Sequence, residues 1–265
     1  MRVGVLGATG RMGRAVCRAV LGAGDLELAA VVAGASKVGR ELREVVPDAP
    51  AGLLVGDDLS ELPTAEVEVV ADFSAPEAAM AAARTLLPVG VHLVSGTTGL
   101  PDAALEELAG LAGREDGGNA VWAPNFALGA VLAAHFAAIA ARHYPAAEVI
   151  ELHHAGKRDA PSGTAARTAR AIAAARGAGE PPPKSEESVP GVRGGEVDGV
   201  RVHSVRLPGL VAHQEVLFGG QGELLTIRHD SLDRSSFMPG VLLAVRQVPT
   251  RRGLTVGLEP LLGLS

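Results

Sequence analysis

The segment from Glu148 to Ala165 is the densest group of side chains able to do acid–base chemistry in this chain. It contains two of the eight histidines, His153 and His154, and Lys157, one of only three lysines. Because 21 of the 24 basic residues are therefore arginine, each lysine is informative: a lysine can tune its pKa and donate a proton, which arginine cannot. The segment predicts a histidine and a lysine beside a bound substrate.

A helix start in the same segment offers a place for an anion. Ser162 follows Pro161 and is a suitable N-cap, so the backbone N–H groups of Gly163 and Thr164 would point outward at a helix N-terminus. Such a terminus binds carboxylates or phosphates. Over residues 142–170, five cations face three anions, a local charge of +2 in a chain whose net charge is −6. A substrate rich in carboxylates is the simplest interpretation.

Two other interpretations of this segment remain open. Metal binding is disfavoured because adjacent histidines on a strand point to opposite faces, and the segment has neither a His-x-x-x-His pair nor a cysteine partner. A strand end with surface charges, followed by a capped helix, would need no function at all. We expect no metal here.

Gly7, Gly10 and Gly13 lie between a valine-rich run and a helix-like segment. Glycines in this place permit a tight turn and a close approach of backbone N–H groups to a pyrophosphate, which the helix N-terminus also favours. The spacing is not the commoner Gly-x-Gly-x-x-Gly, and an ordinary glycine turn is the alternative. The sequence predicts that a dinucleotide is bound by Gly7, Ala8, Thr9, Gly10, Arg11 and Met12.

Two further loops follow predicted strands, where a doubly wound sheet presents its ligand-binding edge. Small hydroxyl side chains and exposed backbone in these loops suit the ribose and carboxamide of a nicotinamide, although each loop could equally be a plain turn. The residues expected to contact the cofactor are Gly96, Thr97, Thr98, Ala123, Pro124, Asn125 and Phe126.

The residue that usually separates NADH from NADPH is missing. An acidic side chain near the end of the second strand usually holds the adenosine ribose, and an arginine there suits the phosphate of NADPH, but this strand ends in Val32 and Ala33. Lys37 and Arg40 lie just beyond and could reach a phosphate or could simply be solvated. The choice between NADH and NADPH stays open.

Strands alternate with helices in the first half of the chain, which predicts parallel βαβ units with helices on both faces of one sheet. A polar connection runs from the second strand to about Leu62. The expected strands are Arg2–Leu6, Leu26–Ala33, Val67–Asp72, Val91–Val94 and Ala120–Trp122, and the expected helices are Arg14–Leu21, Pro76–Leu87 and Pro101–Arg114.

From Phe126 the pattern becomes α+β, with a mixed or antiparallel sheet. Residues 177–199 are rich in Gly, Pro and Glu and predict a long surface connection. The other expected elements are a helix to about Arg142, a strand Glu148–His153, a helix from Ser162, three strands at hairpin spacing (Val200–Leu207, Val211–Phe218 and Glu223–His229), a helix Ser235–Val248 and a strand Leu254–Val256.

The composition excludes several classes of protein. With 265 residues, 47% hydrophobic and 20% charged, the chain can bury a core in one large or two modest domains. A net charge of −6 provides no basic field for nucleic acid or an anionic membrane. The single cysteine cannot form an intramolecular disulfide, and we find no signal peptide or apolar run of about 20 residues. We expect a cytoplasmic protein.

Residues 148–165 resemble the signature of the 4-hydroxy-tetrahydrodipicolinate reductases, formerly called dihydrodipicolinate reductases, of bacterial diaminopimelate and lysine biosynthesis. They meet every fixed position of Glu-[Ile/Val]-x-Glu-x-His-His-x-x-Lys-x-Asp-x-Pro-Ser-Gly-Thr-Ala. The resemblance extends to residues 7–13, 96–98, 123–126 and 204–237, and so to essentially the whole chain.

This resemblance implies that NADH or NADPH reduces a cyclic, imine-containing dicarboxylate, after loss of its hydroxyl as water, to tetrahydrodipicolinate. By position in the motif, His153 would be the acid/base group and Lys157 the proton donor. His154 and the amides of Gly163 and Thr164 would hold a substrate carboxylate.

The resemblance also implies the organisation of the chain. A Rossmann-type dinucleotide-binding domain would span residues 1–125 and be completed by residues 237–265, and an α+β domain over residues 126–236 would bind substrate and form a homotetramer.

Two rival functions explain the sequence less well. A different dehydrogenase on the same scaffold, acting on another small acid, would give no reason for the His-His-Lys and Ser-Gly-Thr run. A nucleotide-sensing protein without turnover would be expected to lack the reactive side chains, yet His153 and Lys157 are both present.

Overall fold

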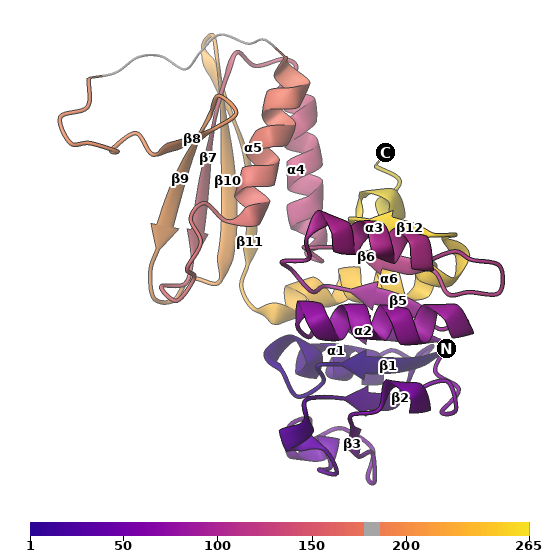
Figure 1. Ribbon diagram of the computed structural model, residues 1–265. Coiled ribbons are helices and arrows are strands. Elements are labelled where there is room, and N and C mark those ends of the chain that lie inside the picture. The colour runs from indigo at the N-terminus through magenta and orange to yellow at the C-terminus, as the bar shows by residue number, and fades with distance from the viewer. Residues whose placement is uncertain (178–185, 265) are drawn as a thin grey trace. The chain divides into compact units, whose positions relative to one another are not determined.

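The computed structural model describes residues 1–177 and 186–264, which form two compact units (Figure 1). The first unit is discontinuous: it comprises Met1–Phe126 and the chain from Phe237 onward. The second unit, Ala127–Ser236, is inserted between these two parts. Part of the connection expected over residues 177–199 lies outside the described residues.

The first unit is built on a seven-stranded sheet in which every pairing is parallel, in the order β12-β6-β5-β4-β1-β2-β3. The chain adds β2 and β3 on one side of β1 and β4, β5 and β6 on the other, which is the predicted doubly wound arrangement. The strands are β1 (Arg2–Leu6), β2 (Glu27–Val32), β3 (Val55–Gly56), β4 (Val69–Asp72), β5 (His92–Ser95), β6 (Ala120–Trp122) and β12 (Leu254–Val256).

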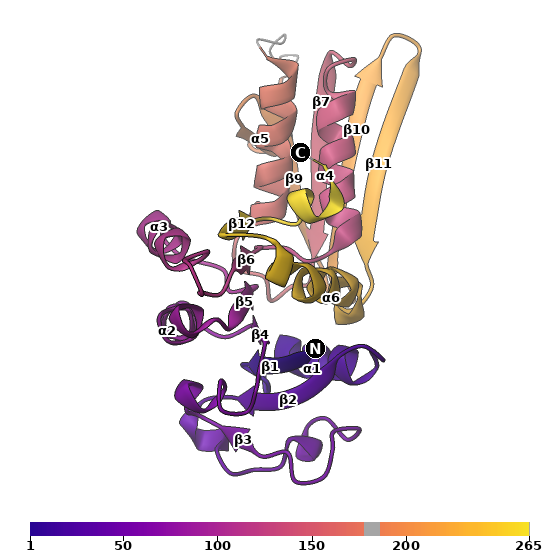
Figure 2. The same ribbon diagram turned by 90° about the vertical axis from the view of Figure 1, so that its right-hand side faces the viewer.

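Helices cover both faces of this sheet (Figures 1 and 2). One face carries α1 (Arg11–Leu21) and α6 (Met238–Gln247), and the other carries α2 (Pro76–Leu86) and α3 (Asp102–Leu111). Strands buried on both faces are apolar throughout, which explains why β4 reads Val-Val-Ala before its terminal aspartate.

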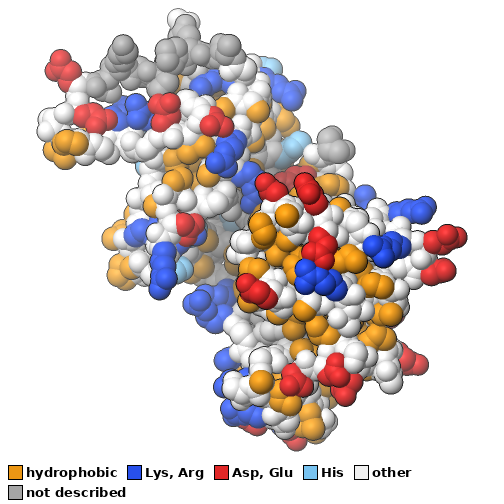
Figure 3. Space-filling view, in the orientation of Figure 1, with side chains coloured by type: hydrophobic (Ala, Val, Ile, Leu, Met, Phe, Trp, Pro, Cys, Tyr) orange, Lys and Arg blue, Asp and Glu red, His pale blue; other side chains and the backbone are white. Residues whose placement is uncertain are grey.

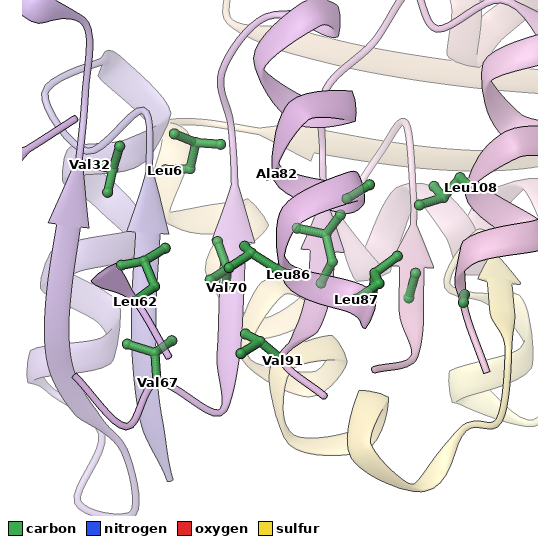
Figure 4. Close-up of a cluster of buried hydrophobic side chains, with 14 residues drawn as sticks. Leu6, Val32, Leu62, Val67, Val70, Ala82, Leu86, Leu87, Val91 and Leu108 are labelled. Atoms are coloured by element: carbon green, nitrogen blue, oxygen red, sulfur yellow. The ribbon is translucent and has the colours of Figure 1, made fainter. Parts of the chain in front are cut away.

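The core between the sheet and the α2–α3 layer is a cluster of aliphatic side chains (Figure 4). Leu86 and Leu87, at the end of α2, are fully buried in it together with Val70 of β4. On the solvent side the same two helices are joined by an ion pair between Arg84 and Glu107. Acidic and basic side chains are interspersed over the face seen in Figure 3.

The second unit has a five-stranded mixed sheet in the order β11-β10-β7-β9-β8, in which only β7 and β9 pair in parallel. Two helices, α4 (Leu128–Ala140) and α5 (Gly163–Arg176), lie side by side on one face of it (Figure 2). The strands are β7 (Ala146–His153), β8 (Gly195–Val197), β9 (Val200–Arg206), β10 (Ala212–Gly220) and β11 (Glu223–Ser231).

The predicted hairpin spacing is correct for β10 and β11 but wrong for β9 and β10. Strand β7 lies between them, so that His153 at its end is paired with Arg206 on one side and Ala212 on the other. The connection over residues 207–211 therefore crosses the end of β7, and five residues easily span two strand spacings of about 4.8 Å each. Spacing along the chain could not reveal the intervening strand.

Three local expectations are corrected by the structure. The connection expected between residues 34 and 62 contains β3, and the one expected over residues 177–199 contains β8. These strands have two and three residues, too few to produce a periodic pattern. Helix α1 begins at Arg11 and not at Arg14, because the glycine turn continues directly into its first turn.

Candidate active site

The predicted cofactor-binding residues lie at one edge of the first sheet. Because the strands are parallel, the loops that follow β1, β5 and β6 emerge at the same edge. These loops contain residues 7–10, 96–98 and 123–126, and the first of them leads directly into α1 at Arg11. Strands β1 and β4 are neighbours, and the chain switches direction across the sheet between them. Such a switch point is where doubly wound sheets bind their ligands.

The glycine turn has the close packing that a bound pyrophosphate requires. Gly7 has φ +79°, and a Cβ atom there would lie 2.7 Å from the backbone oxygen of Phe73. A Cβ atom on Gly13 would lie 2.1 Å from the Gly7 oxygen, so the turn folds directly against α1. Helix α1 has no acidic residue in its first turn and no side chain capping its N-terminus. Its first N–H groups therefore suit an anion.

Asp72, which sequence reasoning missed, fixes the loops around this edge. Its buried carboxylate accepts hydrogen bonds from Ser95 Oγ (2.6 Å), Thr97 Oγ1 (2.8 Å) and the backbone N of Ser74 (3.0 Å). Trp122 Nε1 donates to the Thr97 backbone oxygen at 2.9 Å. The Thr97 hydroxyl is thus bonded to Asp72, whereas Thr98 is exposed. A carboxylate that ends an apolar strand was the available signal.

The cations beyond β2 lie near the glycine turn. Lys37 and Arg40 line one small hollow together with Thr9 and Arg14. The Arg40 guanidinium donates to the Glu44 carboxylate (Nε to Oε2, 2.7 Å), which raises the pKa of Arg40. Lys37 forms no ion pair within the described residues, although the carboxylates of Glu41 and Glu44 also line the hollow and Lys37 helps to lower the pKa of Glu44.

In the second unit, His153 closes β7 with its ring bonded to a buried carboxylate. His153 Nδ1 lies 2.5 Å from Glu151 Oε2, and the Glu151 side chain is fully buried. Because the two residues are two apart on a strand, they point to the same face of the sheet. This contact orients the ring and leaves Nε2 as the nitrogen that can act on a substrate.

Lys157 follows in the turn after β7 and is held by an aspartate. Its Nζ atom lies 2.9 Å from both carboxylate oxygens of Asp159, which lowers the pKa of Asp159. Arg206, at the end of β9, donates to the backbone oxygen of Asp159 at 2.6 Å. The same guanidinium donates to both carboxylate oxygens of Glu151, at 2.7 Å and 2.9 Å.

The N-terminus of α5 joins the same network. Ser162 is confirmed as the N-cap: its Oγ accepts a hydrogen bond from Ala165 N at 3.1 Å. Ser162 N in turn donates to Glu151 Oε1 at 3.1 Å. The first turn of α5 contains no acidic residue, Gly163 is exposed, and Thr164 is half-buried. The helix start is therefore open to an anion.

The pKa values of both His153 and Glu151 are lowered from their ordinary values. Burial, together with the charges of Lys157 and Arg206, lowers the pKa of His153 and outweighs the hydrogen bond and charge of Glu151, which raise it. Burial raises the pKa of Glu151, but hydrogen bonds from Arg206, Ser204 and His153 lower it by more. The site thus combines an ionised Glu151 with a histidine that gives up its proton readily.

The structure brings His153, Lys157 and the start of α5 into one network. It does not bring the His154 ring into it: His154 is exposed, and within the described residues only its backbone oxygen is bonded here, to Lys157 N at 3.1 Å. Sequence reasoning missed the roles of Glu151 and Arg206. A glutamate two residues before a strand-ending histidine was a usable signal for Glu151, whereas Arg206 depends on the β7–β9 pairing.

Neither a metal cluster nor a membrane-spanning helix is found in residues 1–177 and 186–264. No three His, Cys, Asp or Glu side chains gather there as a metal site would require. Across the same residues, every helix is too short or too polar to cross a membrane.

Known protein families and characterised relatives match this chain along nearly its whole length. The families described as "Dihydrodipicolinate reductase, N-terminus" and "Dihydrodipicolinate reductase, C-terminus" match residues 1–126 and 129–262. The chain is 52% identical to 4-hydroxy-tetrahydrodipicolinate reductase of Nocardia farcinica, covering 100% of this chain and 99% of the relative. It is 50% identical to the reductase of the same name from Mycolicibacterium smegmatis, with both chains covered to 100%.

Solved structures of related enzymes have a similar fold. Dihydrodipicolinate reductase from Paenisporosarcina sp. TG-14, with dipicolinate bound, is similar with a TM-score of 0.85 at 39% identity, and each chain is covered to 98%. An amine dehydrogenase from Mycobacterium smegmatis shares the fold, with a TM-score of 0.67 at 16% identity over 96% of this chain and 94% of its own. By sequence and by fold, this chain belongs to the dihydrodipicolinate reductase family.

Proposed function

We propose that this protein reduces 4-hydroxy-tetrahydrodipicolinate to tetrahydrodipicolinate with NADH or NADPH, in diaminopimelate and lysine biosynthesis. One observation carries the proposal: His153, Lys157 and the N-terminus of α5 are linked by a single hydrogen-bond network at the end of β7. The names of the full-length relatives supply the substrate.

On the cofactor side, the turn Gly7–Met12 and the first N–H groups of α1 would hold the pyrophosphate. Residues 96–98 and 123–126 would hold the nicotinamide and its ribose, with Asp72 fixing the first of these loops. The nicotinamide, when bound, supplies the hydride. The first unit would thus be the dinucleotide-binding domain and the second the substrate-binding domain.

On the substrate side, the Gly163 and Thr164 amides, together with His154, would bind one carboxylate. Support comes from the open helix start and from the cyclic dicarboxylate, dipicolinate, bound to the relative from Paenisporosarcina. The Lys157 ammonium would donate a proton and offset the negative charge that grows on the substrate as hydride arrives. His153 would exchange protons through Nε2, because Nδ1 is engaged by Glu151.

The direct test supplies the purified protein with substrate made in place by the preceding synthase and follows oxidation of NADH and of NADPH. Consumption of reduced nucleotide that depends on both the protein and the synthase product supports the proposal. A folded protein that binds the nucleotide but oxidises none would contradict it, and other cyclic imines or a sensing role would then have to be considered.

We propose that both nucleotides are accepted and that Lys37 provides the contact specific to NADPH. Replacing Lys37 with Ala is expected to raise the KM for NADPH about 10- to 100-fold and leave that for NADH within about twofold, because a hydrogen bond to a charged group contributes about 1.5–3 kcal/mol. Steady-state kinetics with both nucleotides measure this. Arg43→Ala, which removes a charge already paired with Glu41, is the control. Equal effects on both nucleotides would contradict the assignment.

A homotetramer in the cytoplasm, where reduced nicotinamide nucleotides are available, completes the proposal. The second unit supports assembly because β11 is a nine-residue edge strand on which Leu224 is 67% exposed. Helix α4 exposes two more large apolar side chains, Phe136 (50%) and Ile139 (45%). Sedimentation equilibrium should give about four times the chain mass of 26.9 kDa, and a monomer at working concentration would exclude the tetramer.

A further inference from the structure

Glu151 and Arg206 form an ion pair that contacts His153, Ser162 and the backbone of Asp159. The Glu151 side chain is fully buried and that of Arg206 is 19% exposed. Two parallel hydrogen bonds join them, a geometry in which a guanidinium and a carboxylate fix each other's orientation. The pair joins β7 to β9, which are parallel neighbours.

Three contacts lead outward from this pair. Glu151 accepts from Ser162 N, which sets the start of α5, and bonds to His153 Nδ1, which sets the ring. Arg206 donates to the backbone oxygen of Asp159, whose carboxylate holds Lys157 Nζ. We propose that Glu151 and Arg206 are positioning residues: they fix the positions of the proton-transfer groups and of the anion-binding helix start relative to one another.

This inference rests on the proposed function for its kinetic consequence but not for its structural one. The charged groups around His153 are Glu151 on β7, Arg206 on β9, and Lys157 with its partner Asp159 in the following turn. Strand β10 places the uncharged Ala212 opposite His153. Glu151 is therefore the only carboxylate bonded to the ring among the described residues, and its charge favours the protonated imidazole.

The test replaces Glu151 with Gln, which keeps the shape of the side chain and removes its charge. Because Glu151 raises the pKa of His153, its loss should lower that pKa further, and Arg206, no longer neutralised, should act in the same direction. An NMR pH titration of the His153 ring in ligand-free protein, assigned by comparison with His153→Gln, measures this directly. Turnover should fall about 100-fold in kcat, as for a reacting group displaced by about 1 Å, with a smaller change in KM.

Glu148→Gln is the matched control. Glu148 lies on the same strand and also accepts from an arginine and a histidine, Arg193 at 2.5 Å and His203 at 2.7 Å, but it is partly exposed and outside the network. This variant changes the charge of β7 equally and should leave both the His153 titration and kcat as in the wild type.

The outcomes separate the two proposals. If the wild-type protein has no turnover but Glu151→Gln lowers the His153 pKa, the positioning role stands and the proposed reaction fails. If Glu151→Gln has the same His153 pKa and the same kcat as the wild-type protein, the positioning role is overturned. If circular dichroism shows that Glu151→Gln is unfolded, Arg206→Lys decides: lysine keeps the charge but lacks the two-pronged donor geometry. Reduced kcat in this folded variant supports the inference, and wild-type kcat with an unmoved titration overturns it.

Discussion

Replacing Lys157 with Ala is expected to lower kcat about 10²- to 10⁴-fold, the usual contribution of a positioned proton-transfer group. The variant loses the ammonium that Asp159 holds at 2.9 Å, while the network of Glu151, Arg206 and Ser162 remains in place. Folding and nucleotide binding should therefore be unchanged. Stopped-flow or steady-state oxidation of NADH, with nucleotide affinity measured separately by fluorescence, gives both quantities.

Two companion variants separate charge from proton donation. Lys157→Arg keeps a cation that does not give up its proton, so it should remain at least about 10²-fold below the wild type if donation is the main role. Arg158→Ala removes the neighbouring exposed cation and should retain wild-type kcat. Full activity in Lys157→Arg would show that only the charge is needed, and full activity in Lys157→Ala would remove Lys157 from the reaction.

Replacing Gly13 with Ala is expected to destabilise the first unit by about 3 kcal/mol or more and to abolish measurable NADH binding. The added methyl would lie 2.1 Å from the Gly7 oxygen and 2.7 Å from the Ala8 Cα, and backbone atoms cannot move aside as a side-chain end can. Overpacking of a core commonly costs about 1–3 kcal/mol. We expect the upper end of this range or more, because the added methyl would meet rigid backbone atoms. Denaturant unfolding and calorimetric titration with NADH measure the two effects.

Gly24→Ala is the control for this variant, because the methyl group it adds would meet nothing within 4 Å and the φ of Gly24 is not positive. Its stability and NADH affinity should match those of the wild type. If Gly13→Ala keeps the stability of Gly24→Ala, then α1 can move away from the turn at little cost. Tight NADH binding by Gly13→Ala would refute the role of this close packing in holding the pyrophosphate.

The glycine turn could be predicted from sequence because its requirements are local. Gly7 needs a positive φ and Gly13 needs the absence of a side chain, and both conditions appear directly as residue type and spacing. The N-cap at Ser162 is local in the same way, since its bond reaches only to Ala165. These features depend on a few neighbouring residues, whereas the close approach of Gly7 to Phe73 requires the pairing of β1 with β4.

The network beneath His153 could not be predicted because it joins distant parts of the chain. Arg206 is 55 positions from Glu151, and the two meet only because β9 pairs with β7 in parallel. The hairpin spacing of the runs that form β9, β10 and β11 predicted β10, and not β7, as the neighbour of β9. Asp72 was visible in the sequence as a carboxylate that ends an apolar strand, but its partners Ser95 and Thr97, on the next strand and loop, were not.

The discontinuity of the first unit has a consequence for how the protein is made. Strand β12 and helix α6, whose Val241 and Val245 are fully buried, emerge from the ribosome only after the whole inserted unit. At about 5–20 residues per second, the nascent chain therefore spends about 7 to 26 s with the edge of β6 unpaired and one face of its sheet incompletely covered. The inserted unit is therefore synthesised in full before the first unit can complete its sheet with β12 and cover that face with α6.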